Sequence, residues 1–395
     1  MSSAVPATAA PRVSLWRLLT VILFSRTVLD TAYRAVYPFL PFIAADLGVP
    51  LQAAAEIIQA RNLIGVFAPV LGPLSDRFGR RVVMLAGIAV IALACLMLLP
   101  VAPFWFVIGA MIMISFGVIL FVPAQQAYLG DKVPYAQRGR AMAFGELAWS
   151  AAALFGLPFV GIILTWAGWR AAFGVLGVLG AAAFVLIWMG LPRVEHHTRH
   201  ALENGGGLRV LARMPMAWAV VGVTFLMALG NENINVVFGA WMNQSFGVNA
   251  VGLGFVASAI GGAELGAELF AAGFVDRLGK WRTVLGSLLI GCAGYFVLPV
   301  LGVNAWLGTL GLVLVYFMFE LAVVAGLPLY SEIFPHARGL VLSLEVASFS
   351  LGRAVGSFAA PALYTQYGFW AASFLSGGAL VAAIAIWILM VREQR

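Results

Sequence analysis

Long apolar runs separated by short polar stretches organise this 395-residue chain. A helix that crosses about 30 Å of hydrocarbon needs roughly 20 mostly apolar residues, so each run is long enough to span a bilayer once. Twelve such runs occur, at residues 15–45, 52–75, 82–101, 104–130, 140–165, 171–191, 216–243, 250–274, 283–302, 305–332, 340–365 and 371–391. The pattern predicts an all-α integral membrane protein with twelve transmembrane helices.

The composition agrees with this prediction, since 63% of the residues are hydrophobic and only 10% are charged. Residues 1–11 are small and polar, and the first apolar run is too long for the core of a signal peptide, so we expect no cleavable signal. Cys95 and Cys292 both fall within apolar runs. We expect them to pack between helices without forming a disulfide.

The net charge is +7, and the distribution of the basic residues along the chain indicates the membrane topology. When both termini are placed in the cytoplasm, 18 of the 23 Lys and Arg residues fall on the cytoplasmic side, and Arg170 alone falls on the opposite side. By the positive-inside rule we expect cytoplasmic N- and C-termini in a cell (inner) membrane. The positive charge therefore does not indicate a nucleic-acid partner.

A charged, glycine-bearing loop separates the second and third runs and reads Gly-Pro-Leu-Ser-Asp-Arg-Phe-Gly-Arg-Arg over residues 72–81. A looser copy, Asp-Arg-Leu-Gly-Lys-Trp-Arg, occupies residues 276–282 and keeps the Asp, Arg and Gly spacing 200 residues later. The same offset relates Gly168 to Gly368. We therefore expect two related six-helix halves.

The halves are predicted to be an N-terminal bundle over 1–191 and a C-terminal bundle over 215–395. A cytoplasmic linker would join them over 192–214, where glycines, arginines and histidines replace the apolar pattern. The segment 195–200 carries three histidines and one glutamate, but no further ligand is placed nearby. We expect a solvated loop there and no metal site.

The loop over 72–81 resembles the signature between the second and third helices of the major facilitator superfamily, Gly-x-Leu-x-Asp-Arg-x-Gly-Arg-Arg, at every fixed position. The chain is therefore similar to the bacterial twelve-helix drug or solute:proton transporters of that superfamily. The resemblance implies two pseudo-symmetric six-helix bundles with the substrate site between them, near the membrane midplane. It also implies that the charged loops gate the exchange between conformations without touching substrate.

In the family the loop aspartate caps helix 11 of the other half and latches the outward-facing state. By resemblance Asp76 would be this cap, and Arg80 would meet Asp131; an anion near a helix N-terminus is favourable. The full set of predicted cytoplasmic gate residues is Gly72, Asp76, Arg77, Gly79, Arg80, Arg81, Asp131, Arg138, Asp276, Arg277, Gly279 and Arg338.

Ionisable residues inside the apolar runs are the candidates for the site itself. Eleven lie away from the run ends: Arg26, Asp30, Arg34, Arg61, Glu146, Glu232, Glu264, Glu268, Glu320, Glu345 and Arg353. At about 3 kcal/mol each, exposure of all of them to lipid would cost on the order of 30 kcal/mol, so they must pair, line a cavity or be neutral. The third, sixth, ninth and twelfth runs carry none, and we expect those helices to face lipid.

Arg26, Asp30 and Arg34 are spaced by four residues and form one ridge of the first helix, with Tyr33 and Tyr37 beside it. We expect this ridge to line a cavity; the alternative is a salt-bridge triad that holds the helix to its neighbours.

The seventh helix carries Asn231, Glu232 and Asn235. These side chains could bind a polar solute or a proton; the alternative is that they form hydrogen bonds between helices.

Glu264 and Glu268 share one face of the eighth helix. Two close carboxylates without a cation cannot both be comfortably ionised, so one should hold a proton at neutral pH unless an arginine reaches across to them. The remaining candidates for the cavity are Arg61, Glu146, Glu320, Glu345 and Arg353.

These features predict a secondary active transporter, not an enzyme, that moves a small organic solute coupled to protons and uses no cofactor. Seven intramembrane acids against four arginines favour export by antiport. The alternatives are proton-coupled uptake of an organic anion or sugar, and a transporter-like sensor or lipid translocase. Residues 106–124 carry no arginine, and Leu157 separates Gly156 from Pro158; both features depart from drug–proton antiporters. We expect a monomer in the lipid bilayer.

Overall fold

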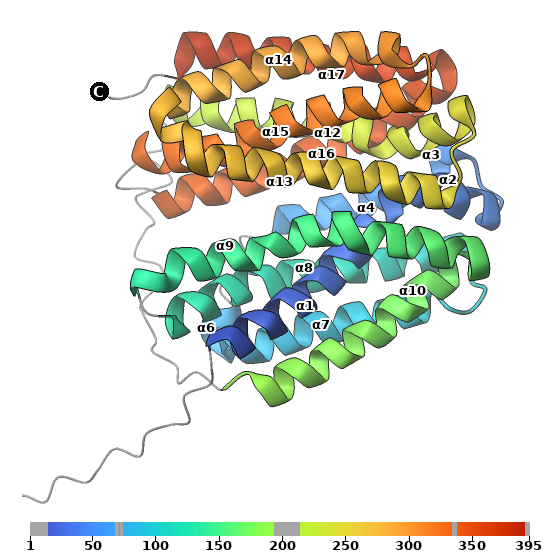
Figure 1. Cartoon of the computed structure of the whole chain (residues 1–395), viewed down its shortest axis with the longest axis vertical. Helices are drawn as coiled ribbons and strands as arrows, with labels where there is room; N and C mark the ends of the chain where they lie inside the picture. The colour runs from blue at the N-terminus through green and yellow to red at the C-terminus, as the bar shows by residue number, and fades with distance from the viewer. Residues whose placement is uncertain are drawn as a thin grey trace, which may run out of the picture.

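The computed structural model describes residues 15–67, 71, 74–133, 135–192, 214–333 and 338–391. Every regular element in these ranges is helical. Figure 1 shows two bundles lying side by side, one formed by the N-terminal helices and the other by the C-terminal helices.

The first bundle contains the elements up to residue 190. These are α1 (Leu15–Arg34), α2 (Val36–Leu47), α3 (Leu51–Ala54), α4 (Glu56–Ile64), η1 (Gly65–Phe67), α6 (Leu74–Phe78), α7 (Arg80–Met97), α8 (Phe104–Lys132), α9 (Tyr135–Ala151), η2 (Ala152–Gly156) and α10 (Leu157–Gly190). Within α10 the chain reverses at Gly168, where φ is 81° and ψ is 168°, so this element contains the end of one membrane span and the whole of the next.

The second bundle is more regular. It consists of α12 (Pro215–Phe246), α13 (Ala250–Leu278), α14 (Lys280–Leu301), α15 (Ala305–Ile333), α16 (Arg338–Tyr367) and α17 (Phe369–Met390). Each of these six helices is long enough to cross a bilayer alone, at about 1.5 Å of rise per residue.

All twelve predicted spans have helical counterparts in the described residues. Within the described ranges, eight helical segments are long and apolar enough to qualify as membrane spans, and one of them, Phe144–Gly190, contains two spans. Three predicted spans, the first, the second and the eleventh, have no counterpart among these eight segments. The first two are broken, between α1 and α2 and again around η1, and all three carry intramembrane arginines.

Among the described residues, six glycines have a positive φ, and they form three pairs along the chain. Gly48 and Gly247 both have φ of 65°, Gly79 and Gly279 have 96° and 86°, and Gly168 and Gly368 have 81° and 79°. Glycine is the residue that adopts these angles without strain. The turns thus repeat with the offset of about 200 residues seen in the motifs, while the exact domain boundaries stay a prediction because residues 193–213 lie outside the described ranges.

The predicted lipid-facing helices lie at the periphery. Figure 1 places α7 and α10 along one edge of the molecule and α14 and α17 along the other. Their exposed side chains are large and apolar, as expected for contact with lipid tails: Leu93, Val185, Leu186, Met189, Leu289, Ile290, Val297, Val381 and Leu389.

The two bundles are in close backbone contact near the turns at Gly48 and Gly247, which we call the Gly48 end. A Cβ atom on Gly239 of α12 would lie 2.5 Å from the Pro38 carbonyl oxygen of α2, and one on Gly161 of α10 would lie 2.6 Å from the Ala250 carbonyl oxygen of α13. Because glycine has no side chain, the backbones of the two bundles can come into contact at these positions. The opposite end, which carries Gly79 and Gly279, we call the Gly79 end.

Candidate functional site

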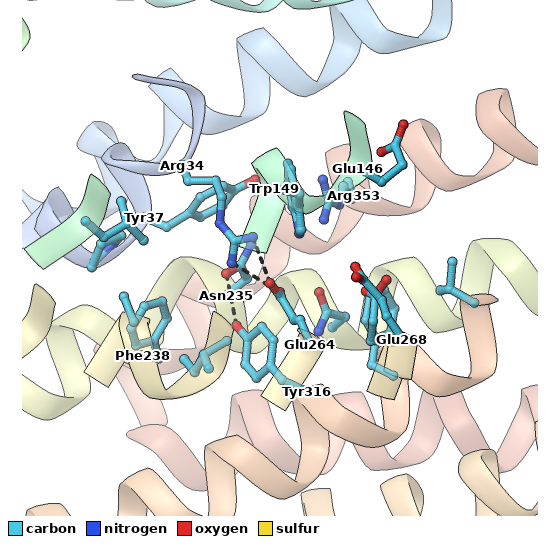
Figure 2. A pocket seen from close by; sticks show the side chains of 18 of the residues that line it. Arg34, Tyr37, Glu146, Trp149, Asn235, Phe238, Glu264, Glu268, Tyr316 and Arg353 are labelled. Atoms are coloured by element: carbon cyan, nitrogen blue, oxygen red, sulfur yellow. Dashed lines mark hydrogen bonds and ion pairs between the residues drawn. The ribbon is translucent and has the colours of Figure 1, made fainter. Parts of the chain in front are cut away.

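A cavity of about 250 Å³ lies between the bundles and draws residues from both. Its polar lining consists of Arg26, Arg34, Tyr37, Glu146, Asn231, Asn235, Glu264, Glu268, Tyr316, Glu320 and Arg353. Drug-sized ligands occupy pockets of roughly 300–1,000 Å³, so this volume suits a small solute. Figure 2 shows the charged side chains converging on the space from opposite sides.

Arg34 joins the two bundles through a bidentate ion pair. Its Nη1 donates to Glu264 Oε2 at 2.7 Å and its Nη2 to Glu264 Oε1 at 3.1 Å (Figure 2). Both residues are buried, and the guanidinium lies over the Trp149 ring at 4.3 Å. The sequence left open whether an arginine would neutralise the glutamates of α13; Arg34 does so for Glu264.

Glu232 is a second link between the bundles, although its side chain does not line the cavity. It is fully buried and accepts hydrogen bonds from Tyr37 Oη at 2.7 Å and from Asn62 Nδ2 at 2.9 Å, both in the first bundle. Within its own bundle it accepts from Asn235 Nδ2 at 3.3 Å and lies 3.5 Å from Arg353 Nε. A single carboxylate therefore holds parts of α2, α4, α12 and α16 together.

Arg26 forms a third polar cluster, entirely within the first bundle. Its Nε donates to Asp30 Oδ2 at 2.8 Å, its Nη1 donates to Gln125 Oε1 at 3.2 Å, and its Nη2 lies 3.5 Å from Glu146 Oε2. The predicted ridge on the first helix is therefore divided: Arg26 and Asp30 tie α1 to α8 and α9, while Arg34 reaches the other bundle.

Arg61 lies outside the cavity and is almost completely buried. Its guanidinium lies 4.0 Å from the Tyr33 ring and 4.6 Å from the Tyr37 ring, and its Nη1 donates to the Tyr33 carbonyl oxygen at 2.5 Å. No carboxylate lies within ion-pair distance of Arg61 among the described residues. Aromatic faces are thus its main stabilising partners.

Glu268 and Glu320 differ from the other acids of the cavity. Both line it, yet neither makes an ion pair or a hydrogen bond with any described side chain. The part of the cavity wall that the second bundle contributes therefore carries two carboxylates whose oxygens can accept a hydrogen bond or bind a cation.

The structure places ten of the fifteen predicted site residues around the cavity. Asp30, Tyr33, Arg61, Glu232 and Glu345 lie outside its lining; Asp30 and Glu232 hold lining residues in position instead. Apart from Tyr37, the aromatic part of the lining was not predicted; it comprises Trp149, Phe238, Tyr316, Phe319 and Phe349. Helical spacing contained a signal, because Trp149 follows Glu146 by three residues and Phe349 precedes Arg353 by four.

Several predicted gate residues lie at the Gly79 end. Arg80 Nε is 3.4 Å from Asp131 Oδ2, the contact that the family resemblance implied. In the second bundle Lys280 pairs with Glu332 and lies 4.0 Å from Asp276. Arg77, Arg81 and Arg277 lie on the same end, where Arg81 donates to the Trp188 carbonyl oxygen. Outside the described residues lie Gly72, the side chains of Asp76, Arg138 and Arg338, and the segment 195–200.

Comparison with known proteins agrees with the fold. A family model described as Major Facilitator Superfamily matches residues 22–225 and again residues 220–395. The "Uncharacterized MFS-type transporter YwfA" of Bacillus subtilis (strain 168) is 25% identical over 361 residues, covering 89% of this chain and 85% of the relative. The "Multi-drug resistance efflux pump PmrA homolog" of Lactococcus lactis is 22% identical over 269 residues, or 66% of each chain.

A solved structure described as a D-xylose-proton symporter superposes with a TM-score of 0.76 at 18% identity, covering 96% of this chain and 98% of that one. The predicted fold class of two six-helix bundles is thereby confirmed. Because the family model matches both halves, this chain belongs to the major facilitator superfamily, a family of multi-pass membrane transporters.

Proposed function

We propose that this protein is a proton-coupled secondary transporter that moves a small organic solute by alternating access, with export by antiport favoured over uptake. The observation that carries the proposal is the pair of carboxylates, Glu268 and Glu320, that line the cavity without an ion pair to any described residue. Acids in this setting can exchange protons with water whenever the cavity opens. The sequence contains no P-loop, which disfavours ATP as a direct energy source.

Alternating access is supported by the asymmetry between the two ends. The bundles touch through Gly239 and Gly161 at the Gly48 end. Towards the other end, the Glu146 side chain on the cavity wall is 44% exposed. If the termini are cytoplasmic, as we propose, this arrangement corresponds to an inward-facing conformation of a protein in the inner membrane. The opposite conformation would require breaking the Arg34–Glu264 pair and the bonds from Tyr37 and Asn62 to Glu232.

Antiport follows if solute and proton compete for the same carboxylates. Loading of solute from the cytoplasm would displace protons, and protons entering from outside would displace solute in turn. The runner-up is symport, in which Arg34 or Arg26 would hold an organic anion or a sugar while a proton binds alongside. A sensor would bind the ligand without turnover.

The test is proton exchange during ligand addition, followed by transport. Purified protein in weakly buffered detergent solution is titrated with a panel of solutes while pH is recorded, and the same protein is placed in liposomes with a pH-sensitive dye inside. Proton release and flux driven by a pH gradient support antiport. Proton uptake with flux indicates symport, and binding without flux would refute the transport proposal in favour of a sensor.

A further inference from the structure

We infer that the cavity between the bundles takes a small organic cation that carries an apolar or aromatic group. This inference rests on the proposed transport function and names its substrate class. It follows from which charges on the cavity wall are already neutralised and which are not.

Each arginine that lines the cavity is neutralised by a carboxylate. Arg34 makes the bidentate pair with Glu264 at 2.7 and 3.1 Å, and Arg26 lies 2.8 Å from Asp30. Arg353 lies 3.5 Å from Glu232. An anionic solute would have to displace one of these carboxylates and leave it in a buried place without a partner, which is unfavourable.

The acidic residues of the cavity wall, unlike its arginines, include side chains that have no ion-pair partner among the described residues. Glu268 of α13 and Glu320 of α15 have no ion pair in the part of the chain that the structure describes. The charged groups that act on them are Glu264, Glu146, Arg34 and Arg353, and of these both arginines are engaged with other carboxylates. A cation entering the cavity would supply the missing counter-charge without breaking an existing pair.

The aromatic wall suits the same class of ligand. The Arg34 guanidinium lies 4.3 Å from the centre of the Trp149 ring, and the Arg353 guanidinium lies 4.9 Å from that of Phe349. These contacts show that the wall already holds positive charge against aromatic faces. Tyr316 and Phe238 extend the aromatic surface, as Figure 2 shows, and would contact the apolar part of the ligand.

The size of the space restricts the ligand further. A volume of about 250 Å³ suits a solute of one ring with a compact cationic group and excludes large drugs in this conformation. Benzyltrimethylammonium is a suitable probe because its charge is permanent and independent of pH. Phenylmethanesulfonate is a matched anion with the same benzyl group.

The experiment measures binding of both probes to the full-length protein in detergent by calorimetry. We expect the cation to bind at least about tenfold more tightly than the anion, and its affinity to fall as the pH is lowered because protons compete for Glu268 and Glu320. E268Q and E320Q should each weaken cation binding by about tenfold. E345Q, which changes a buried acid outside the cavity, should leave the affinity within about twofold.

Equal or tighter binding of the anion would overturn the inference, as would binding of neither probe by the unmodified protein. Unchanged cation binding in the doubly substituted E268Q/E320Q protein would also overturn it. The two proposals fail in different ways. Cation binding without flux in liposomes refutes transport and keeps the binding class, whereas gradient-driven flux of the anion alone refutes the cation inference and keeps transport.

Discussion

The hydrogen bond from Tyr37 to Glu232 gives a direct test of how the Gly48 end is held closed. The bond joins the bundles at 2.7 Å, and both side chains are buried. Tyr37→Phe removes only the hydroxyl. A hydrogen bond to a charged group contributes about 1.5–3 kcal/mol, and each 1.4 kcal/mol changes an equilibrium by about tenfold.

Opening at the Gly48 end should therefore become roughly 10- to 150-fold more favourable in the Tyr37→Phe protein. The lower part of this range is expected, because Asn62 still donates to Glu232 across the same interface at 2.9 Å. The Arg34–Glu264 pair also remains.

The assay measures labelling of a cysteine placed at Ser258, whose hydroxyl donates to the Leu154 carbonyl oxygen across the interface at 3.0 Å. In the proposed topology, a membrane-impermeant maleimide added from outside should react only when the Gly48 end opens. Cys95 and Cys292 are buried and are replaced beforehand. We expect faster labelling in the Tyr37→Phe background.

Tyr316→Phe is the matched control, since Tyr316 Oη donates to Asn235 Oδ1 at 2.9 Å within one bundle. It removes a hydroxyl of the same kind but no contact between bundles, so its labelling rate should equal that of the parent. If Tyr37→Phe also labels at the parental rate while remaining folded, the reasoning about this bond is wrong.

Three further predictions concern charged residues. Glu264→Gln leaves Arg34 buried opposite a neutral amide, so thermal unfolding in detergent should reveal a loss of up to about 3–5 kcal/mol, and adding Arg34→Met should recover part of it; a stable single variant would contradict this. Combining Glu268→Gln with Glu320→Gln should flatten the pH dependence of transport in liposomes, and an unchanged profile would move proton coupling to another acid. Asp76→Asn should slow transport while solute affinity stays within a few-fold, and a large loss of affinity would argue against a gating role.

The spans and turns were predictable because hydrocarbon thickness fixes helix length and because a reversal with positive φ requires glycine. Gly168 and Gly368 illustrate this, since they are 200 residues apart and have nearly the same φ, 81° and 79°. The partners of charged residues were not predictable in the same way. Whether Arg34 meets Glu264 or Glu268 depends on how α1 and α13 are rotated in the packed structure, which no local pattern encodes.

The aromatic wall was missed for a related reason. Trp149 lines the cavity, while Trp166 is 86% exposed on the outer surface. Aromatic residues are favourable in both places, so abundance alone cannot assign them. Spacing from a charged residue does not separate the two cases either, because Trp166 precedes Arg170 by four residues.

If the bundles tilt about their close backbone contact at the Gly48 end, each long helix acts as an arm that extends from that contact. Gly254 of α13 would have a Cβ atom 2.8 Å from Pro158, and Leu278 ends the same helix 24 residues further on. At 1.5 Å per residue, that arm is about 36 Å long, so a tilt of about 10° moves its far end by roughly 6 Å. In the proposed transport cycle, a modest angular change would thus be enough to admit or release a one-ring solute at the Gly79 end.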